Sequence, residues 1–447
     1  STLKMRRLAG LWALAASYSC CAAARSEIGA YVSPVTQPPC GGRSAGGVMR
    51  ISRRPSSPAA PQPPPLSAVS ALPAAAASPV AASGASVTVK GLYALLQVIS
   101  GGALASMADA GGLLSPDDTK ALSRLFYNVF QPCLLFVALA ESLAQGGMPV
   151  RLLLVLPLMA LIHIMFGFIA AFTTGRLTGL SMGGRAQKEL NILTGIGNAA
   201  TIPFLFIDAL FRGSNSPLLS PALAAAAVYL LTWNPILWSV GNAILCDAFP
   251  DHTHDGQGGE ATAGIGDLAR SAFLSPPVIA SAAGLAAGSI APVRAALIGA
   301  NAPLRFIFSS LRSIGGAALP AAVIVLGGAL SRALREGEEK ITLSNVLQAL
   351  RVIFSRFVIV PVCALGALRG FERLGLLTAQ DSMARMIVLM TGCAMPSPII
   401  YVAMLRIAGQ AKGAGRAAKM LAVQYMMALV PMALSLSWVL RASGIAI

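Results

Sequence analysis

The sequence predicts an all-α integral membrane protein with ten transmembrane helices, arranged as two inverted repeats of five helices each. Three observations predict this fold class. First, 55% of the 447 residues are hydrophobic and only 11% are charged, with a mean hydropathy of +0.71, whereas soluble domains carry about 25% charged residues. Second, apolar stretches of roughly 20 residues, long enough to cross a bilayer, recur along the chain. Third, prolines recur at matching positions in its two halves.

The first 88 residues differ in composition from the remainder, and we exclude them from the predicted fold. The stretch 55–86 consists almost wholly of Pro, Ala, Ser and Val, which cannot build a hydrophobic core. Near the start, MRRLAGLWALAASYSCCAAARS is typical of a secretory signal, and the acid-poor stretch that follows is typical of a transit peptide. We therefore expect a disordered targeting leader over 1–88. The alternative is a disordered leader without a targeting role.

Ten apolar stretches follow the leader, and each has about the length of one membrane span. They form a first five-helix repeat over 89–245, a short hydrophilic loop over 246–272 and a second five-helix repeat over 273–447. The ten predicted spans cover residues 89–108, 121–143, 151–174, 190–211, 221–245, 273–292, 303–331, 345–368, 383–405 and 417–441.

Proline positions indicate the internal repeat. Pro132 in the second span and Pro320 in the seventh lie 188 residues apart, and Pro203 in the fourth and Pro396 in the ninth lie 193 residues apart. Because five is an odd number, the second copy must enter the membrane from the opposite side. Inverted repeats whose interrupted helices meet near the midplane are the construction of many secondary transporters. The sequence thus predicts that the fourth and ninth helices are broken and cross one another.

Charge and cysteine patterns exclude other classes of protein. The net charge of +16 comes from Lys and Arg residues spread over short loops and the leader, without the aromatic platforms of a nucleic-acid-binding protein. None of the seven cysteines has the spacing of a zinc or redox motif, so we expect no metal or other cofactor. The spans contain no paired acids or Ser/His arrangement, so we do not expect an enzyme. The sequence leaves open whether the chain forms a homodimer.

The fourth span contains the polar stretch LNILTGIGNAATIPFLF at 190–206. Four of its polar residues are spaced by three, four and three residues: Asn191, Thr194, Asn198 and Thr201. On one helix they would share a face. Pro203 ends the run of helical hydrogen bonds, and an unsatisfied carbonyl in lipid costs several kcal/mol. We therefore expect this span to face the interior of the bundle. The ninth span carries a matching set, Pro396, Ser397 and Pro398.

Broken helices at a crossing present N–H groups and positive half-helix ends, which attract carboxylates. An anion site could therefore form without a buried Lys or Arg, as suits spans with almost no charge. We assign substrate hydrogen bonding to Asn198, Thr201 and Asn191, with Ser397 in the matching role across the crossing. The helix breaks are assigned to Pro203, Pro396 and Pro398. The alternative is that the polar side chains only bond neighbouring helices.

Three residues outside these breaks are further candidates. Tyr127 and Gln131 lie four apart in the second span and are candidates to line the same cavity, although packing between helices explains them equally well. His163 is the only histidine in a predicted span, and an ionisable group inside a membrane is a functional candidate. It could carry a proton; the alternative is a neutral histidine bonded to a neighbouring helix.

A longer stretch supports a family resemblance. Residues 275–330 read SPPVIASAAGLAAGSIAPVRAALIGANAPLRFIFSSLRSIGGAALPAAVIVLGGAL. This stretch, together with LSRLFYNVFQPCLLFVALAESL at 122–143, GIGNAATIP and GCAMPSP, resembles the PIN-LIKES branch of the auxin efflux carrier family. The resemblance covers residues 90–441 and implies ten spans, inverted repeats and passage of an indole carboxylate or similar organic anion. The chain departs from the family pattern at Ala199 and Ala200, where a proline is expected, and at Ile400, where an asparagine is expected.

We therefore expect a secondary transporter that moves an organic anion, such as an auxin-like carboxylate, by alternating access. The alternative is a bile-acid-type or other organic-anion symporter on a related ten-helix scaffold. A receptor-like or purely structural protein would not require the paired proline breaks. The expected partners are the lipid bilayer and the small organic anion, with no nucleic acid. The resemblance implies the endoplasmic reticulum, whereas the leader suggests a plastid envelope.

Overall fold

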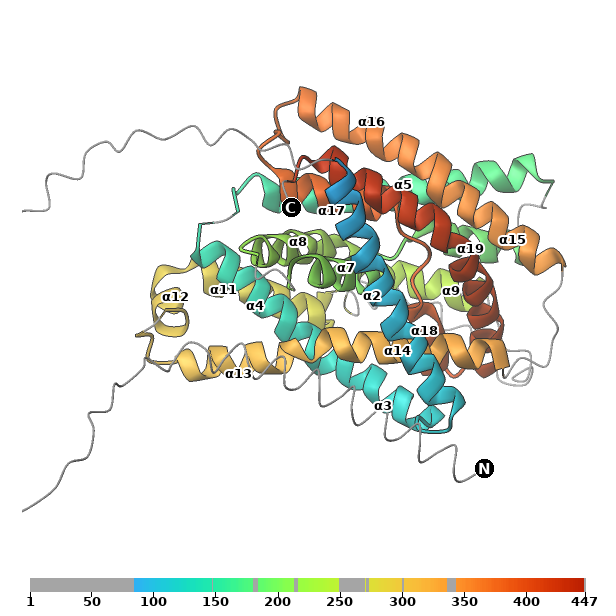
Figure 1. Cartoon of the computed structure of the whole chain (residues 1–447), viewed down its shortest axis with the longest axis horizontal. Coiled ribbons are helices and arrows are strands. Elements are labelled where there is room, and N and C mark those ends of the chain that lie inside the picture. The colour runs from blue at the N-terminus through green and yellow to red at the C-terminus, as the bar shows by residue number, and fades with distance from the viewer. Residues whose placement is uncertain are drawn as a thin grey trace, which may run out of the picture. The chain divides into compact units, whose positions relative to one another are not determined.

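The computed structural model is helical throughout the residues that it describes, and these contain no β-strand (Figure 1). They all belong to one unit of the chain, Ala76–Ile447. The predicted leader lies outside the described residues up to residue 83, and so does most of the predicted loop over 246–272. The described residues are 84–146, 148–179, 184–212, 216–248, 270, 273–299, 301–335 and 343–445.

Helices in the first half of this unit follow the predicted order. They are α2 (Gly84–Ala110), α3 (Pro116–Leu125), α4 (Gln131–Ala144), α5 (Leu152–Leu177), α6 (Arg185–Gly195), α7 (Thr201–Phe211), α8 (Leu219–Ile236) and α9 (Asn242–Ala248). Two π-helical turns, η1 (Phe126–Phe130) and η2 (Leu237–Gly241), join α3 to α4 and α8 to α9. Each of these pairs therefore continues as one long helix.

The second half has the same kind of helices. They are α11 (Pro276–Ser289), α12 (Ala291–Leu297), α13 (Arg305–Gly316), α14 (Ala318–Arg335), α15 (Leu343–Phe354), α16 (Val360–Arg373), α17 (Ser382–Cys393), α18 (Ile400–Ile407) and α19 (Ala411–Ser443). A third π-helical turn, η4 (Ser355–Ile359), joins α15 to α16. A helix or a pair of helices lies at each of the ten predicted span positions.

Seven helices among the described residues are long and apolar enough to cross a membrane. The number is eight if α11 and α12, which meet at 98°, form one bent span. The shorter apolar helices α7 and α17 lie within the predicted fourth and ninth spans. These lengths and compositions support an all-α membrane protein.

Local sequence explains where α3 and α4 begin. Ser115 and Asp118 form a reciprocal capping box at the start of α3, and Pro116 occupies its first turn, where no helical N–H bond is lost. The turn η1 directly precedes Pro132, which lies in the first turn of α4. A proline has no N–H to donate, so the chain re-forms its helical ladder through a π turn at this point.

The core surrounds α8, which is buried on all sides between Ala222 and Leu230. It packs against α4, α5 and α17, and Figure 1 shows α7 and α8 among the surrounding helices. A helix that is apolar all round belongs in the interior of a bundle. Glycine permits an equally close approach elsewhere, because a Cβ at Gly284 would lie 2.7 Å from the carbonyl oxygen of Phe136. The helices α11 and α4 can therefore pack backbone to backbone.

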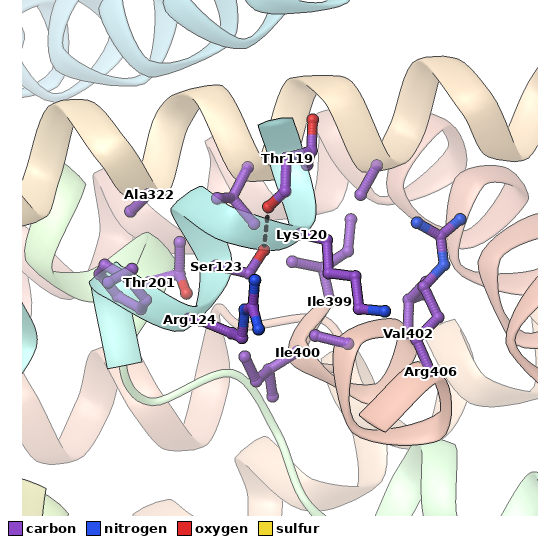
Figure 2. Close-up of a pocket in the computed structure, with 14 residues that line it drawn as sticks. Thr119, Lys120, Ser123, Arg124, Thr201, Ala322, Ile399, Ile400, Val402 and Arg406 are labelled. Carbon is purple, nitrogen blue, oxygen red and sulfur yellow. Dashed lines mark hydrogen bonds between the residues drawn. The ribbon is translucent and has the colours of Figure 1, made fainter. Parts of the chain in front are cut away.

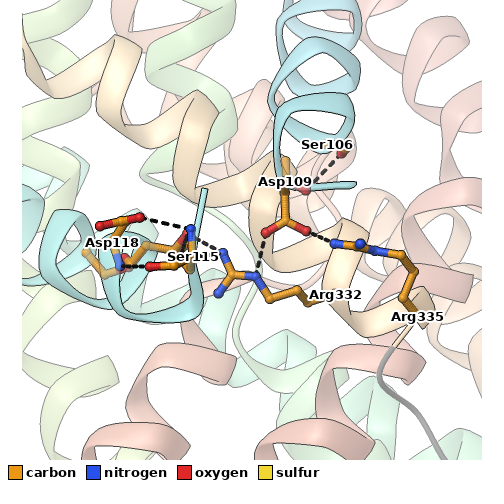
Figure 3. Close-up of polar contacts among 9 residues, drawn as sticks. Ser106, Asp109, Ser115, Asp118, Arg332 and Arg335 are labelled. Atoms are coloured by element: carbon orange, nitrogen blue, oxygen red, sulfur yellow. Dashed lines mark hydrogen bonds and ion pairs between the residues drawn. The ribbon is translucent and has the colours of Figure 1, made fainter. Parts of the chain in front are cut away.

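A buried ion-pair network joins α2, α3 and α14 (Figure 3). Asp109 accepts from the Nε of Arg332 at 2.6 Å and also pairs with Arg335. Arg332 donates in addition to the hydroxyl of Thr119 and to the carbonyl of Ser115. The side chains of Asp109 and Arg332 are 1% and 2% exposed. Because an unpaired buried charge is strongly destabilising, the network holds the first turn of α3 against α14.

A second ion pair fixes the beginning of α17. Arg151 donates to Asp381 at 2.8 Å, immediately before α17. Burial on its own would raise the pKa of the Asp381 carboxyl, but hydrogen bonds from Thr378 and the pairing with Arg151 together hold that pKa below its ordinary value. The carboxylate is therefore ionised at neutral pH and anchors α17 to the segment before α5.

Candidate functional site

Two interrupted helix pairs meet at their breaks. Residues 196–200 separate α6 from α7, and residues 394–399 separate α17 from α18. The breaks are in direct contact, because the N–H of Asn198 donates to the carbonyl of Pro396 at 2.8 Å. The fourth and ninth predicted spans are thus each interrupted, and their non-helical segments lie against one another. We call this region the crossing.

The prediction that Pro203 ends the fourth-span helix is wrong. Pro203 lies in the first turn of α7, where backbone N–H groups have no helical partner in any case. The helix ends instead at Gly195, before Gly197 and Asn198. In the ninth span the prediction is closer, because Pro396 and Pro398 lie within the break itself.

The prediction that four polar residues of the fourth span share one helical face is therefore also wrong. Asn191 and Thr194 lie on α6, Asn198 lies in the break and Thr201 begins α7. The break turns the chain between them. Only Asn198 and Thr201 reach the cavity described below, and Asn191 instead accepts a hydrogen bond from Gln187 at 2.5 Å.

Side chains from other helices satisfy carbonyl groups that the breaks release. The indole N–H of Trp233 on α8 donates to Gly197 at 2.9 Å. The hydroxyl of Tyr425 on α19 donates to the carbonyl of Ser397 at 2.9 Å, and the hydroxyl of Ser397 donates to the carbonyl of Leu193. Because lipid supplies no such donors, these contacts allow the non-helical backbone to persist inside the bundle.

Arg356, on η4, lies at the crossing, which corrects the expectation of a site without a buried Lys or Arg. The residue is 2% exposed. Its guanidinium donates to the carbonyls of Met395 at 3.1 Å, Thr194 at 3.3 Å and Thr391 at 3.4 Å. The sequence carries a signal for it, since an arginine inside a predicted span is a functional candidate by default. The contacts themselves depend on tertiary structure.

A cavity lies beside the crossing, and its space of about 310 Å³ includes a part that is open to solvent. Five of the predicted site residues line it: Tyr127, Gln131, Asn198, Thr201 and Pro398. The sequence analysis missed its other polar and aromatic walls, Phe126, Trp233, Asn234 and Trp238. The rings of Tyr127 and Trp238 pack against each other at a tilt of 41°, with centroids 4.2 Å apart. The cavity therefore combines amide groups with an aromatic wall.

Two further cavities adjoin the first, and all three share Phe126 and Thr201 in their walls. The larger has a volume of about 800 Å³, part of which opens to solvent. Figure 2 shows Lys120 and Arg124 from α3 and Arg406 from α18 around this space. Its lining residues include no acidic side chain. A positively charged, largely apolar space thus leads to the crossing.

The half-helices divide the crossing into two electrostatic sides. The first residues of α7 and α18, Thr201 and Ile400, line the cavities, and helix N-termini carry partial positive charge. The last turns of α6 and α17 point their carbonyls at Arg356 instead. The cavity side therefore favours a negative solute, whereas the carbonyls at the ends of α6 and α17 are bound by a guanidinium that does not line the cavities.

Ser397 and His163 are two further predicted site residues that lie outside the cavity walls. Ser397 is fully buried at the crossing, where its hydroxyl donates to the carbonyl of Leu193. His163 is 4% exposed, and its Nδ1 lies 2.9 Å from the hydroxyl of Tyr229. Among the described residues, no group of three or more His, Cys, Asp or Glu side chains is placed to hold a metal ion.

A family model described as membrane transport protein matches residues 91–256 and 262–436. The chain belongs to this family. Membership in the membrane transport protein family makes the chain an integral membrane protein and implies a small-molecule substrate.

Relatives within the membrane transport protein family include PIN-LIKES proteins of Arabidopsis thaliana. Protein PIN-LIKES 4 is 25% identical over 342 residues, covering 61% of this chain and 79% of the relative. Protein PIN-LIKES 3 is 25% identical over 318 residues, covering 61% and 77%. Protein PIN-LIKES 2 is 32% identical over 139 residues, and this match spans only 29% of that protein. The predicted resemblance to the PIN-LIKES branch is confirmed.

Proposed function

We propose that the chain is a secondary transporter that carries an organic anion, such as an indole carboxylate, by alternating access. The observation that carries this proposal is the set of adjoining cavities, which link a cationic opening to the amide and aromatic groups at the crossing. An aromatic carboxylate needs such a combination: ring surface for its apolar part, and donors or positive charge for its carboxylate.

In this proposal, positive charge attracts the anion in two stages. Lys120, Arg124 and Arg406 raise the local concentration of anions at the opening. The N-terminal ends of α7 and α18 then take over at the crossing, where backbone N–H groups favour a carboxylate. The ring of the solute lies against Trp233 and Trp238, and Asn198 and Thr201 provide hydrogen bonds.

The remaining predicted residues take supporting roles. Tyr127 and Gln131 line the same cavity and shape it. Ser397 holds the backbone of the crossing through its hydrogen bond to the carbonyl of Leu193. Asn191 accepts from Gln187 within α6 and supports that helix. We give His163 no proton-carrying role, because its ring is enclosed with Tyr229 and lies outside the cavity walls.

Alternating access requires two bodies that move about the crossing. We propose that the chain forms ten spans in two inverted repeats, with α6–α7 and α17–α18 as the corresponding broken spans. The matching position of the two breaks supports this arrangement, which many secondary transporters share. Rocking of one body against the other would expose the cavity to each side of the membrane in turn.

The membrane in which the transporter operates is a separate proposal. The resemblance to PIN-LIKES proteins favours the endoplasmic reticulum, and the composition of residues 1–88 makes the plastid envelope the alternative. A fluorescent fusion of the whole chain, compared with one that lacks residues 1–88, separates the two. An endoplasmic-reticulum pattern for both fusions supports the first location; plastid rims that vanish on deletion support the second.

The test of the site is flux of radiolabelled indole-3-acetate into proteoliposomes. Asn198→Ala should lower flux by about tenfold or more, because it removes an amide from the cavity wall. The matched control is Asn128→Ala, since Asn128 is exposed on η1 and outside the cavity walls. Equal flux for wild type and both variants would contradict the assignment of Asn198.

A further inference from the structure

The guanidinium of Arg356 lies in a cage of three backbone carbonyls at the crossing and donates a hydrogen bond to each of them. Thr194 contributes the carbonyl from the last turn of α6, Thr391 contributes one from the last turn of α17, and Met395 contributes one from the ninth-span break. Two half-helices thus direct their negative ends at a single cation. Among the described residues, no carboxylate pairs with Arg356. The hydrogen-bond acceptors of the guanidinium are the main-chain carbonyls named above.

A cage of this kind is the ligand set that other carriers use for a coupling ion. In transporters with interrupted helices, unwound carbonyls and the C-terminal ends of half-helices coordinate the driving cation. Oxygen ligands of neutral charge suit a monovalent cation, whereas a divalent ion usually requires carboxylates. Here a side chain of the protein occupies the space that such an ion would fill.

The local sequence leaves room for this guanidinium. A Cβ added to Gly197 would overlap Nη2 of Arg356, so a side chain at this position would displace the guanidinium from its carbonyl partners. The carbonyl of Gly197 also accepts a hydrogen bond from the indole N–H of Trp233. The break therefore contacts both the guanidinium and the indole N–H, and the contact with the guanidinium depends on the absence of a side chain at this position.

We propose that Arg356 is a built-in counter-cation, a positioning residue that replaces a coupling ion at the crossing and whose removal leaves a vacant monovalent-cation site. The proposal rests on the proposed transport function for its flux consequences, but not for the cation site itself. Because arginine does not lose its proton in proteins, this charge stays in place throughout the transport cycle. It holds the two half-helices together without binding or releasing an ion.

The direct test is cation rescue of Arg356→Ala. The purified variant is studied by thermal unfolding in detergent and by indole-3-acetate flux in proteoliposomes. We compare choline chloride with NaCl and with guanidinium chloride at concentrations far below those that denature proteins. In choline, the variant should unfold at a lower temperature than wild type and lose at least about tenfold in flux. Guanidinium or Na⁺ should raise the unfolding temperature and restore part of the flux.

The control for this experiment is Arg312→Ala, because Arg312 lies on α13 with its side chain 56% exposed and pairs with Glu141. Neither this variant nor wild type should respond to guanidinium or Na⁺. Unfolding and flux of Arg356→Ala that match wild type in choline would overturn the proposal. An Arg356→Ala variant that is impaired but unaffected by either cation would overturn it as well.

Two further variants keep the proposal testable if Arg356→Ala does not fold. Arg356→Lys retains the charge but reaches fewer carbonyls, so it should fold and lower kcat while leaving KM for indole-3-acetate near that of wild type. A KM that rises with an unchanged kcat would contradict a positioning role. Gly197→Ala should lower the unfolding temperature of wild type and cost less when Arg356 is already lysine. Strictly additive effects would contradict the steric argument.

Failure of the proposed function is distinguishable from failure of this inference. The unfolding measurement needs no substrate. If wild type moves no indole-3-acetate while Arg356→Ala is stabilised by guanidinium, the substrate proposal fails and the cation site stands. If wild type transports and the variant ignores both cations, the cation site fails and the transport proposal stands.

Discussion

Asn198 both holds the two breaks together and lines the cavity. Its N–H binds Pro396, its side-chain amide donates to the hydroxyl of Tyr425 at 3.2 Å, and its side-chain oxygen accepts from the N–H of Ile202 at 3.4 Å. The same residue lines the cavity. A solute that bonds to this amide therefore acts directly on the contact between the two breaks, which links binding to the geometry of the crossing.

Trp233 offers a test at the residue scale. Trp233→Phe keeps an aromatic ring in the cavity wall but leaves the carbonyl of Gly197 without its donor. An unsatisfied buried carbonyl costs about 1–3 kcal/mol, so the unfolding temperature in detergent should fall. The matched control is Trp238→Phe, because Trp238 contributes an aromatic ring, packed against Tyr127, to the same cavity. Equal losses of stability in the two variants would contradict a specific role for the indole N–H of Trp233.

At the scale of helices, the sequence predicts that the fourth and ninth spans break, but not where each break begins. Proline signals a break because it lacks an N–H, yet Pro203 is accommodated in the first turn of α7. The fourth-span helix ends instead at Gly195, where glycine and asparagine favour irregular backbone. The cationic opening could not be predicted from spacing, because Lys120 and Arg406 come from different helices, α3 and α18, and meet only in the folded bundle.

The network around Asp109 offers a test at the same scale. Asp109→Ala leaves the 2%-exposed Arg332 without its carboxylate, and breaking a buried pair from one side costs about 3–5 kcal/mol. The double variant Asp109→Ala, Arg332→Met should recover much of this loss. Glu141→Ala serves as control, because its partner Arg312 is exposed and such pairs contribute only about 0–1 kcal/mol. Thermal unfolding in detergent measures all three; a double variant less stable than Asp109→Ala would contradict the account.

At the scale of the whole molecule, the two ends of the half-helices at the crossing have different surroundings. Half-helix N-termini face the cavities, and half-helix C-termini face Arg356. The sequence analysis predicted the first half of this arrangement from the paired breaks, but it treated the spans as nearly free of charge. Arg356 shows that a span of moderate hydropathy can contain a buried arginine, because carbonyls from two other helices accept hydrogen bonds from its guanidinium.

The measurement that tests this account most directly is saturable uptake of radiolabelled indole-3-acetate by wild-type proteoliposomes in choline salts, with Na⁺ absent and the same pH on both sides. A fixed guanidinium in place of a coupling ion predicts saturable uptake above that of protein-free liposomes, unchanged when NaCl replaces choline chloride. Uptake that equals the protein-free background, or that arises only after Na⁺ is added, would contradict the account.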